Sequence, residues 1–424
     1  MTVQIKKEEL FSFLPEHAFA FFADTPVVYH CHHYNLWLDQ TIDDALGARE
    51  GLALRVRTAH EAFYHYLAQL VPRSGADTPA EKLKVAELIF AAMGHGNLRL
   101  HTQAQGGLAT GDFLHYGYTW KEKYGEKVRR RHTADAVAAG CAVAATEIAF
   151  DLPMGTLDVA EETCVSLGAP QCRFQIEGAK QPMPPSRPVG KRETQRLLGD
   201  SFTGKHEEQI RAITTGLRSF LGTINSDQRG LVQGFGVFVT LHLASYYNGI
   251  SYNALYNIER TAPQSFDVMQ GLLIEAGHQC GFNTFGGILR SPEWEGLVGA
   301  PTGDPLEILI GCCAIGRALG FGQWTIQDFA PDKHFVLRTP GTYESTYHVT
   351  RHGLASSGRC YLHQGGTLAA VQLAHRVPWR EKPTFDQDFY RSLFHSDPQW
   401  RVQETHCVSK GDDYCEVAVE RVRK

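Results

Sequence analysis

The pattern E-x2-C-V-S-x-G-x3-C occurs twice in this chain, at residues 161–172 and again at 404–415. Such a recurrence is typical of a chain that contains duplicated structural units. Looser matches lie upstream, where Gly94 and Gly96 after one helical run have counterparts in Gly320 and Gly322 after another. The sequence therefore predicts two tandem copies of one domain, each of which ends in the cysteine pattern.

A proline-rich segment lies between the two copies. Residues 178–192 read GAKQPMPPSRPVGKR, and a polar run rich in proline is typical of an extended linker. We therefore expect a first domain over 1–177, a linker over 178–192 and a second unit over 193–424. The second unit is expected to begin with an additional helix over 193–220.

Within each copy the sequence patterns indicate both helices and strands. In the first copy, apolar spacing predicts a helix over 82–93, and an alanine-rich run predicts another over 137–150. The glycine-interrupted stretch 98–118 is typical of strands and turns, and residues 157–176 of a hairpin. The predicted fold class is therefore α+β, with antiparallel strands, packed helices and a metal-binding hairpin at the end of each copy.

Composition excludes several classes of function. With 41 Lys and Arg against 46 Asp and Glu, the formal net charge is −5, which argues against a general nucleic-acid binder. There is no apolar run of membrane-spanning length and no apolar core of a signal peptide near the N-terminus. We therefore expect a cytoplasmic protein, in which the ten cysteines are better explained as metal ligands or buried thiols than as disulfides.

The repeated pattern contains the donor types of a tetrahedral metal site. A short turn between Cys164 and Cys172 brings two thiols together, and Glu161 adds an oxygen from the same strand end. These are three ligands of a zinc site, and Cys141 on the preceding helix is the candidate for the fourth. Two other interpretations stay open, namely a pair of buried thiols beside an exposed glutamate, and a disulfide.

The second copy repeats the same three donors. Glu404, Cys407 and Cys415 have the spacing of the first set. For the fourth ligand the sequence offers two candidates, Cys360 and His395. The second pattern therefore predicts a second metal site with a less certain ligand set.

The pattern E-x2-C-x7-C after an Ala/Gly-rich helix resembles the 4-vinyl reductase domain family. It is similar in particular to the zinc-containing sensory domains of aromatic-responsive bacterial transcription activators. The resemblance implies structural zinc at the two ligand sets above, and a fold like that of Golgi-transport and haem-based nitric-oxide sensor domains. It also implies a closed pocket for a small hydrophobic or aromatic molecule, and pairing of two chains into a homodimer. Because the domain is duplicated, the two copies in one chain could equally pair with each other. The family name is no evidence for reductase chemistry.

Two features of those activators are missing from the sequence. The nearest approach to a phosphate-binding loop, Gly199-x4-Gly204-Lys205, continues with His206 where Ser or Thr is needed. No helix-turn-helix is evident either. The chain is therefore expected to be a free-standing pair of domains that binds a small molecule. An accessory protein of tetrapyrrole metabolism is a third hypothesis, which rests on the family name alone.

Aromatic and histidine side chains near the glycine pairs are candidates for the pocket wall. A histidine or tryptophan there could form a hydrogen bond to a phenol-like ligand. An aromatic core with hydrogen-bonded histidines is the plainer interpretation. The candidate ligand-binding residues are His95, His115, Tyr116, Trp120, Trp324 and Tyr343.

A histidine cluster in the first copy suggests an alternative function. On a strand, His30 and His32 would share one face, with His33 on the other. Glu61 and His65, spaced i, i+4 on a helix, could add a carboxylate or a third imidazole. Two histidines and a carboxylate suit non-haem iron, so these five residues are the candidates for the active site of a metal-dependent enzyme. A polar surface segment without chemistry is the plainer interpretation.

Overall fold

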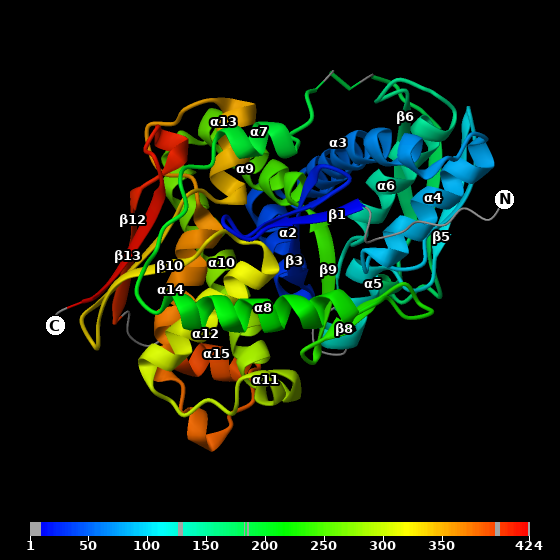
Figure 1. The fold of residues 1–424 in the computed structure, drawn as a ribbon. Helices are drawn as coiled ribbons and strands as arrows, with labels where there is room; N and C mark the ends of the chain where they lie inside the picture. The colour runs from blue at the N-terminus through cyan, green and yellow to red at the C-terminus, as the bar shows by residue number, and fades with distance from the viewer. Residues whose placement is uncertain (1–9, 126–129, 182, 185, 395–398, 423–424) are drawn as a thin grey trace.

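The computed structural model describes residues 10–125, 130–181, 183–184, 186–394 and 399–422. Two halves follow each other along the chain, and strands from both halves form a sheet between them (Figure 1). None of the helices among the described residues combines the length and the apolar composition that a membrane-spanning segment needs. His395, one candidate ligand of the second metal site, lies outside the described residues.

Each half contains a four-stranded antiparallel sheet with the same strand order. The two orders are β4-β5-β7-β6 and β10-β11-β13-β12, and a bulge follows Glu161 in β6 and Glu404 in β12. The strands are β4 (Arg99–Gln103), β5 (Gly106–Gly111), β6 (Leu157–Thr163), β7 (Cys172–Gly178), β10 (Thr325–Ala330), β11 (His334–Thr339), β12 (Trp400–His406) and β13 (Cys415–Arg421). The predicted α+β class, with an antiparallel cysteine hairpin at the end of each half, is confirmed.

A third sheet joins the two halves. Its order is β1-β2-β3-β9-β8, in which β3 and β9 pair antiparallel, with Val28 opposite His242 and His30 opposite Thr240. The strands are β1 (Phe11–Leu14), β2 (Phe19–Phe22), β3 (Thr25–Cys31), β8 (Val232–Gly234) and β9 (Val237–Leu243). Both β3 and β9 are almost wholly buried and apolar apart from their histidines and threonines, as expected of strands covered on both faces. One hydrophobic core therefore continues through both halves.

Matching helices pack behind the sheets. In the first half α3 packs along α6, in the second α10 packs along α14, and α2 of the first half also packs against α10. The principal helices are α2 (His32–Leu46), α3 (Ala48–Ser74), α4 (Pro79–Ala92), α5 (His115–Tyr124), α6 (Ala136–Ala149), α9 (Ala244–Thr261), α10 (Phe266–Leu289), α12 (Pro305–Leu319), α13 (Tyr343–His352) and α14 (Tyr361–Arg376). Shorter or peripheral helices are α7 (Lys191–Arg196), α8 (Glu207–Thr223), α11 (Pro292–Leu297) and α15 (Gln387–Phe394).

Three local predictions were wrong. Residues 98–118 are not all strands and turns, because α5 begins at His115. The expected helix over 193–220 is divided into α7 and α8. The histidine cluster is not a strand throughout, since β3 ends at Cys31 and α2 begins at His32. From Asn35 onward the buried positions of α2 recur at helical spacing, and this longer pattern overrides the short alternation that suggested a strand.

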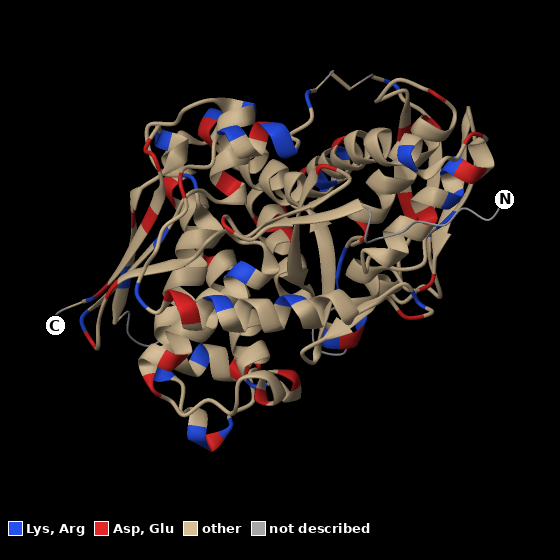
Figure 2. Cartoon of the chain, in the orientation of Figure 1, with Lys and Arg blue, Asp and Glu red and all other residues tan. Residues whose placement is uncertain are grey.

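Charged side chains of both signs are interspersed over the two halves, and the central strands β3 and β9 carry none (Figure 2). One group of charges is nevertheless buried beside these strands. The guanidinium of Arg55 on α3 lies 2.8 Å from Asp39 and 2.7 Å from Asp43, both on α2. Tyr246 on α9 donates a hydrogen bond of 3.0 Å to Asp39. Burial raises the pKa of Asp39 to about 6, which shows how strongly this environment disfavours charge.

Replacing Arg55 with leucine is expected to destabilise the protein by about 3–5 kcal/mol. The buried carboxylate of Asp39 loses its ion pair, and Asp43 keeps only its contacts with Arg130 and His132. The matched control is Arg73→Leu on the same helix, whose ion pair with Asp24 is about half exposed and is expected to contribute at most about 1 kcal/mol. Urea denaturation measures both. Similar losses in the two variants would contradict this view of the buried group.

Candidate metal centres and the buried network

Four donors meet at the end of the first half. The ligand atoms of Asp135, Glu161, Cys164 and Cys172 all lie within 4.8 Å of one another. The two sulfurs are 3.8 Å apart, and Asp135 Oδ2 lies 3.1 Å from the sulfur of Cys172 and 3.6 Å from that of Cys164. This group, the N-terminal centre, could hold a metal ion.

A second group of the same shape lies at the end of the chain. The ligand atoms of Cys360, Glu404, Cys407 and Cys415 also lie within 4.8 Å of one another. Cys360 Sγ is 3.5 Å from Cys407 Sγ and 3.8 Å from Cys415 Sγ, and the latter two sulfurs are 3.9 Å apart. This group, the C-terminal centre, could likewise hold a metal ion, with Cys360 as its fourth donor.

The hairpin turn explains why these residue types recur at this spacing. After the first cysteine the chain forms a short 3-10 turn, η1 (Val165–Leu167) or η4 (Val408–Lys410). Each turn ends in a glycine with a left-handed backbone, Gly168 at φ +93° and Gly411 at φ +95°, a conformation that glycine adopts at little cost. The backbone N–H of the residue after the first cysteine then points at the second sulfur, at 3.3 Å in one centre and 3.4 Å in the other.

The fourth donor of the N-terminal centre is Asp135, which the sequence analysis missed. Asp135 and Cys360 occupy the same structural position, the residue immediately before α6 and before α14. The predicted donor, Cys141, is fully buried within α6 and is not a member of the group. Six residues of helix correspond to about 9 Å along the axis, which places Cys141 too far from the hairpin. An aspartate before an alanine-rich helix is a signal for an N-cap, yet its side chain makes no cap hydrogen bond here.

The four donors of each centre do not satisfy one another by hydrogen bonding, and a metal ion would. One carboxylate oxygen of Glu161 and one of Glu404 are buried without a hydrogen-bond partner. Burial raises the pKa of both carboxyl groups well above the ordinary value, and the negative charge of the neighbouring cysteine, Cys164 or Cys407, adds to the effect. All described cysteines are free thiols, and sulfurs nearly 4 Å apart are not bonded. A divalent cation would satisfy every donor in either group at once.

Each centre is connected to the protein interior by the helix beside it. In the N-terminal centre, the backbone N–H of Gly117 in α5 donates to Asp135 Oδ1 at 3.1 Å. In the C-terminal centre, the Thr342 hydroxyl, at the start of α13, lies 3.1 Å from Cys360 Sγ. The first residues of α5 and α13, His115 and Tyr343, are both buried. Each centre is therefore in contact with the beginning of a helix, α5 or α13, whose first residue is a buried polar side chain.

These buried side chains contact strands from the opposite half. His30 of β3 lies 3.2 Å from the Tyr343 hydroxyl, with its ring against Phe321 of the second half. In return, His242 of β9 packs against His95, at 4.6 Å between ring centroids, and lies 3.3 Å from the Tyr116 hydroxyl of the first half. We call these two groups the interior sites. The first contains His95, Tyr116 and His242, and the second contains His30, Phe321 and Tyr343, so each combines side chains from both halves.

A hydrogen-bonded chain links the two sites. Asn35 donates to His115 Nε2 at 2.9 Å and to the Thr240 hydroxyl at 3.0 Å. The Tyr247 hydroxyl donates to Asn35 Oδ1 at 2.5 Å, and the Tyr247 ring stands edge-on to that of His30. Hydrogen bonds therefore run from His115 through Asn35 to Tyr247, and a ring contact completes the path to His30.

The predicted pocket residues occupy three places. His95, His115 and Tyr116 lie together in the first half, and Trp324 and Tyr343 lie in the second. Trp120 lies elsewhere, under the guanidinium of Arg130, at a hollow that it shares with Trp37 and Tyr124. The sequence had grouped Trp120 with His115 because they are close along the chain, whereas the first and sixth residues of a helix project in different directions.

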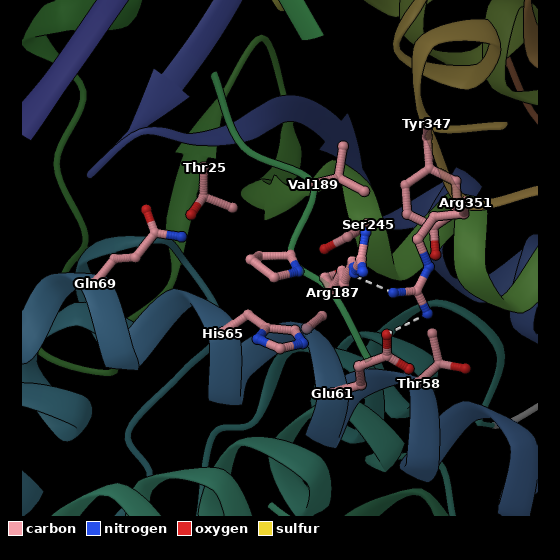
Figure 3. Close-up of a pocket in the computed structure, with 12 residues that line it drawn as sticks. Thr25, Thr58, Glu61, His65, Gln69, Arg187, Val189, Ser245, Tyr347 and Arg351 are labelled. Atoms are coloured by element: carbon pink, nitrogen blue, oxygen red, sulfur yellow. Dashed lines mark hydrogen bonds and ion pairs between the residues drawn. The ribbon is translucent and has the colours of Figure 1, made fainter. Parts of the chain in front are cut away.

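The predicted catalytic residues do not form one group. His32 and His33 pack against each other, with 4.0 Å between their ring centroids. His32 also lies 3.4 Å from the Phe238 carbonyl oxygen and His33 lies 3.4 Å from the Tyr124 hydroxyl, whereas His30 contacts Phe321 of the second half. Glu61 pairs with Arg351 at 2.6 Å, and His65 lies 2.8 Å from the Ser186 hydroxyl. Both line the hollow of Figure 3, beside the linker residues Arg187 and Val189. Among the described residues, these histidines and Glu61 do not form a group that could hold a metal ion.

Several buried polar atoms in the two interior sites have no partner. Both ring nitrogens of His95 and the Tyr66 hydroxyl are unpaired among the rings of Phe63 and Phe90. In the second half, Trp324 Nε1 and both nitrogens of His363 are likewise unpaired. An unsatisfied buried donor or acceptor costs about 1–3 kcal/mol. The sequence had singled out His95 and Trp324, but their lack of partners emerges only in the folded chain.

No family model and no curated protein sequence matches the chain. Among solved structures, the phenol-responsive sensory domain of the transcription activator PoxR, solved with phenol, is similar at 12% identity and a TM-score of 0.35. The alignment covers 49% of this chain and 90% of that one. Values this low establish no function, and membership of the 4-vinyl reductase family stays a prediction.

The buried histidines are expected to make stability sensitive to acid. Burial lowers the pKa of His95 well below its ordinary value of 6.5 and that of His115 to about 3. Below pH 6.5 the unfolded chain therefore binds more protons than the native protein, and the free energy of unfolding falls as the pH falls. Each such histidine contributes a slope of at most about 1.4 kcal/mol per pH unit. Urea denaturation between pH 6.5 and 4 should show a shallower slope for His95→Phe than for the parent protein. The control is His101→Phe, at an exposed position of β4, and an unchanged slope in His95→Phe would refute the assignment.

Proposed function

We propose that the chain binds a small hydrophobic or aromatic molecule in its interior and holds zinc at both centres as a structural ion. The unpaired ring nitrogens of His95, enclosed by aromatic rings, are the observation that carries the ligand-binding part. An aromatic molecule with a hydroxyl group would pair a nitrogen while its ring packs among Phe63 and Phe90. Trp324 and His363 provide a corresponding unpaired set in the second half.

The donor chemistry supports zinc. Thiolates mixed with carboxylates suit zinc, whereas magnesium and calcium prefer oxygen alone. Four protein donors fill a tetrahedral zinc ion and leave no position for a substrate. When bound, the ion would stabilise the hairpin and the helix start beside it. Asp135 or Cys360 would transmit that order to α5 or α13, and so to His115 or Tyr343.

Two adjoining hollows lie between the linker and the interior, with volumes of about 20 and 10 Å³, room for little more than one water molecule each. The hollow of Figure 3 is lined by Val189, Ser245 and Tyr347, and the same three residues line a second hollow that reaches Tyr343. The linker segment around Val189 lines the part that the two hollows share. It would have to move for an aromatic ligand to reach Tyr343 from this side.

The domain organisation follows from the same arrangement. We propose boundaries at 1–177, 178–192 and 193–424, with the two units paired through β3 and β9. This pairing within one chain supports the prediction that the two copies pair with each other, in place of a homodimer of two chains. The metal-dependent enzyme is not proposed, because its five candidate residues are divided among three places. His32 packs against His33, Glu61 and His65 line the hollow of Figure 3, and His30 contacts the second half.

Ligand binding is tested by thermal unfolding with three molecules of similar size, phenol, toluene and benzoate. Phenol is expected to raise the melting temperature most, since it alone combines an uncharged ring with a hydroxyl. A ligand at a hundredfold excess over its dissociation constant stabilises by about 2.7 kcal/mol. His95→Phe introduces the residue found at the equivalent position, Phe321, and should abolish the advantage of phenol over toluene. His101→Phe is the matched control. The absence of any shift in the parent protein would contradict the proposal.

The metal part is tested by elemental analysis of the purified full-length chain. We expect about two zinc ions per chain, because the donors form two closed sites. Cys164→Ser and Cys407→Ser should each lose one ion, whereas Cys312→Ser, in the buried helix α12, should keep both. A protein with iron or copper in place of zinc, or with no metal, would overturn this assignment.

A further inference from the structure

The two metal centres differ at a single donor. Both contain the Glu-Cys-Cys hairpin with the same internal spacing, the same bulge and the same N–H···S contact. At the position before the packed helix, however, the N-terminal centre has Asp135 and the C-terminal centre has Cys360. The donor sets are therefore two sulfurs with two carboxylates in one centre, and three sulfurs with one carboxylate in the other.

This difference changes the chemistry of the site without changing its formal charge. An ionised aspartate and a thiolate each carry one negative charge, so both fully ionised sets carry four. A carboxylate is a harder donor than a thiolate, and thiolate ligands favour zinc and other soft ions over hard ones. The N-terminal centre should therefore hold zinc less tightly and discriminate less against harder divalent ions.

The contacts of the two side chains strengthen the contrast. Asp135 already accepts the N–H of Gly117 through Oδ1, so only Oδ2 faces the sulfurs. Cys360 Sγ contacts both other sulfurs of its centre and also the Thr342 hydroxyl. Asp135 therefore divides its two oxygens between the centre and α5, whereas Cys360 contacts its centre and the start of α13 through one sulfur atom.

We propose that the C-terminal centre retains its zinc permanently, whereas the N-terminal centre is a weaker site whose ion exchanges. This inference rests on the proposed function, because it requires a metal at both centres. Through Gly117, the occupancy of the N-terminal centre would set the order of α5, which carries His115 and Tyr116 into the first interior site. The N-terminal centre would in this way make ligand binding in the first half dependent on metal.

Reciprocal substitutions test the proposal in the full chain. Zinc is removed stepwise by a competing chelator and counted by elemental analysis. The parent protein should release one ion at a chelator concentration at least about tenfold lower than the other, since even outer-shell changes alter metal affinity by 10–100-fold. Asp135→Cys should merge the two steps at the tighter value, and Cys360→Asp should merge them at the weaker one. The untouched centre in each variant reports whether the chain is still folded.

Cobalt substitution identifies which centre is which. Thiolate-to-cobalt charge-transfer absorbance grows with the number of sulfurs bound. The C-terminal centre, with three sulfurs, should therefore contribute about one and a half times the absorbance of the N-terminal centre, with two. Asp135→Cys should equalise them. Release of both ions in one step from the parent protein, or earlier release from the C-terminal centre, would overturn the inference but leave the structural zinc in place. Absence of metal from both centres would overturn the proposed zinc sites as well.

Discussion

The antiparallel pairing of β3 with β9 is the contact on which the rest of the structure depends. These strands come from different halves of the chain, and their pairing places His30 in the second half and His242 in the first. Backbone hydrogen bonds fix the register, and a shift by one residue would turn every side chain to the opposite face. The interior sites therefore exist only because the halves exchange these strands.

The two groups of candidate metal ligands lie at the opposite ends of the same sites. Each hairpin holds the beginning of one helix, α5 or α13, whose first residue contacts the exchanged strands through Asn35 or His30. The path from a centre to the middle of the molecule is therefore short and consists of hydrogen-bonded groups. Buried polar networks of this kind are rigid when every member is paired. The exceptions, such as His95 and Trp324, are the points where the chain leaves hydrogen-bonding capacity unused.

Local patterns were sufficient for much of the fold. The helices near 82–93 and 137–150 and the hairpin at 157–176 were predicted within a few residues, because apolar spacing and glycine turns are properties of the sequence itself. Short signals failed where a longer one competed, as at His32, where the helical pattern of α2 overrides strand alternation. The hairpin donors were also evident, since each set is contiguous in sequence.

The fourth donor shows where local reasoning ends. Cys141 was the obvious candidate by residue type, but helix geometry places it away from the hairpin, and Asp135 stands where Cys360 stands in the other half.

The sequence by itself determined the duplicated hairpins, their six donors and the α+β class, because these depend on spacing within short segments. Only the tertiary structure decided the fourth donors, the division of the five candidate catalytic residues among three places and the exchange of β3 and β9. Those features depend on which surfaces of distant segments pack together, and the energy of such packing is shared among many side chains that no local pattern identifies.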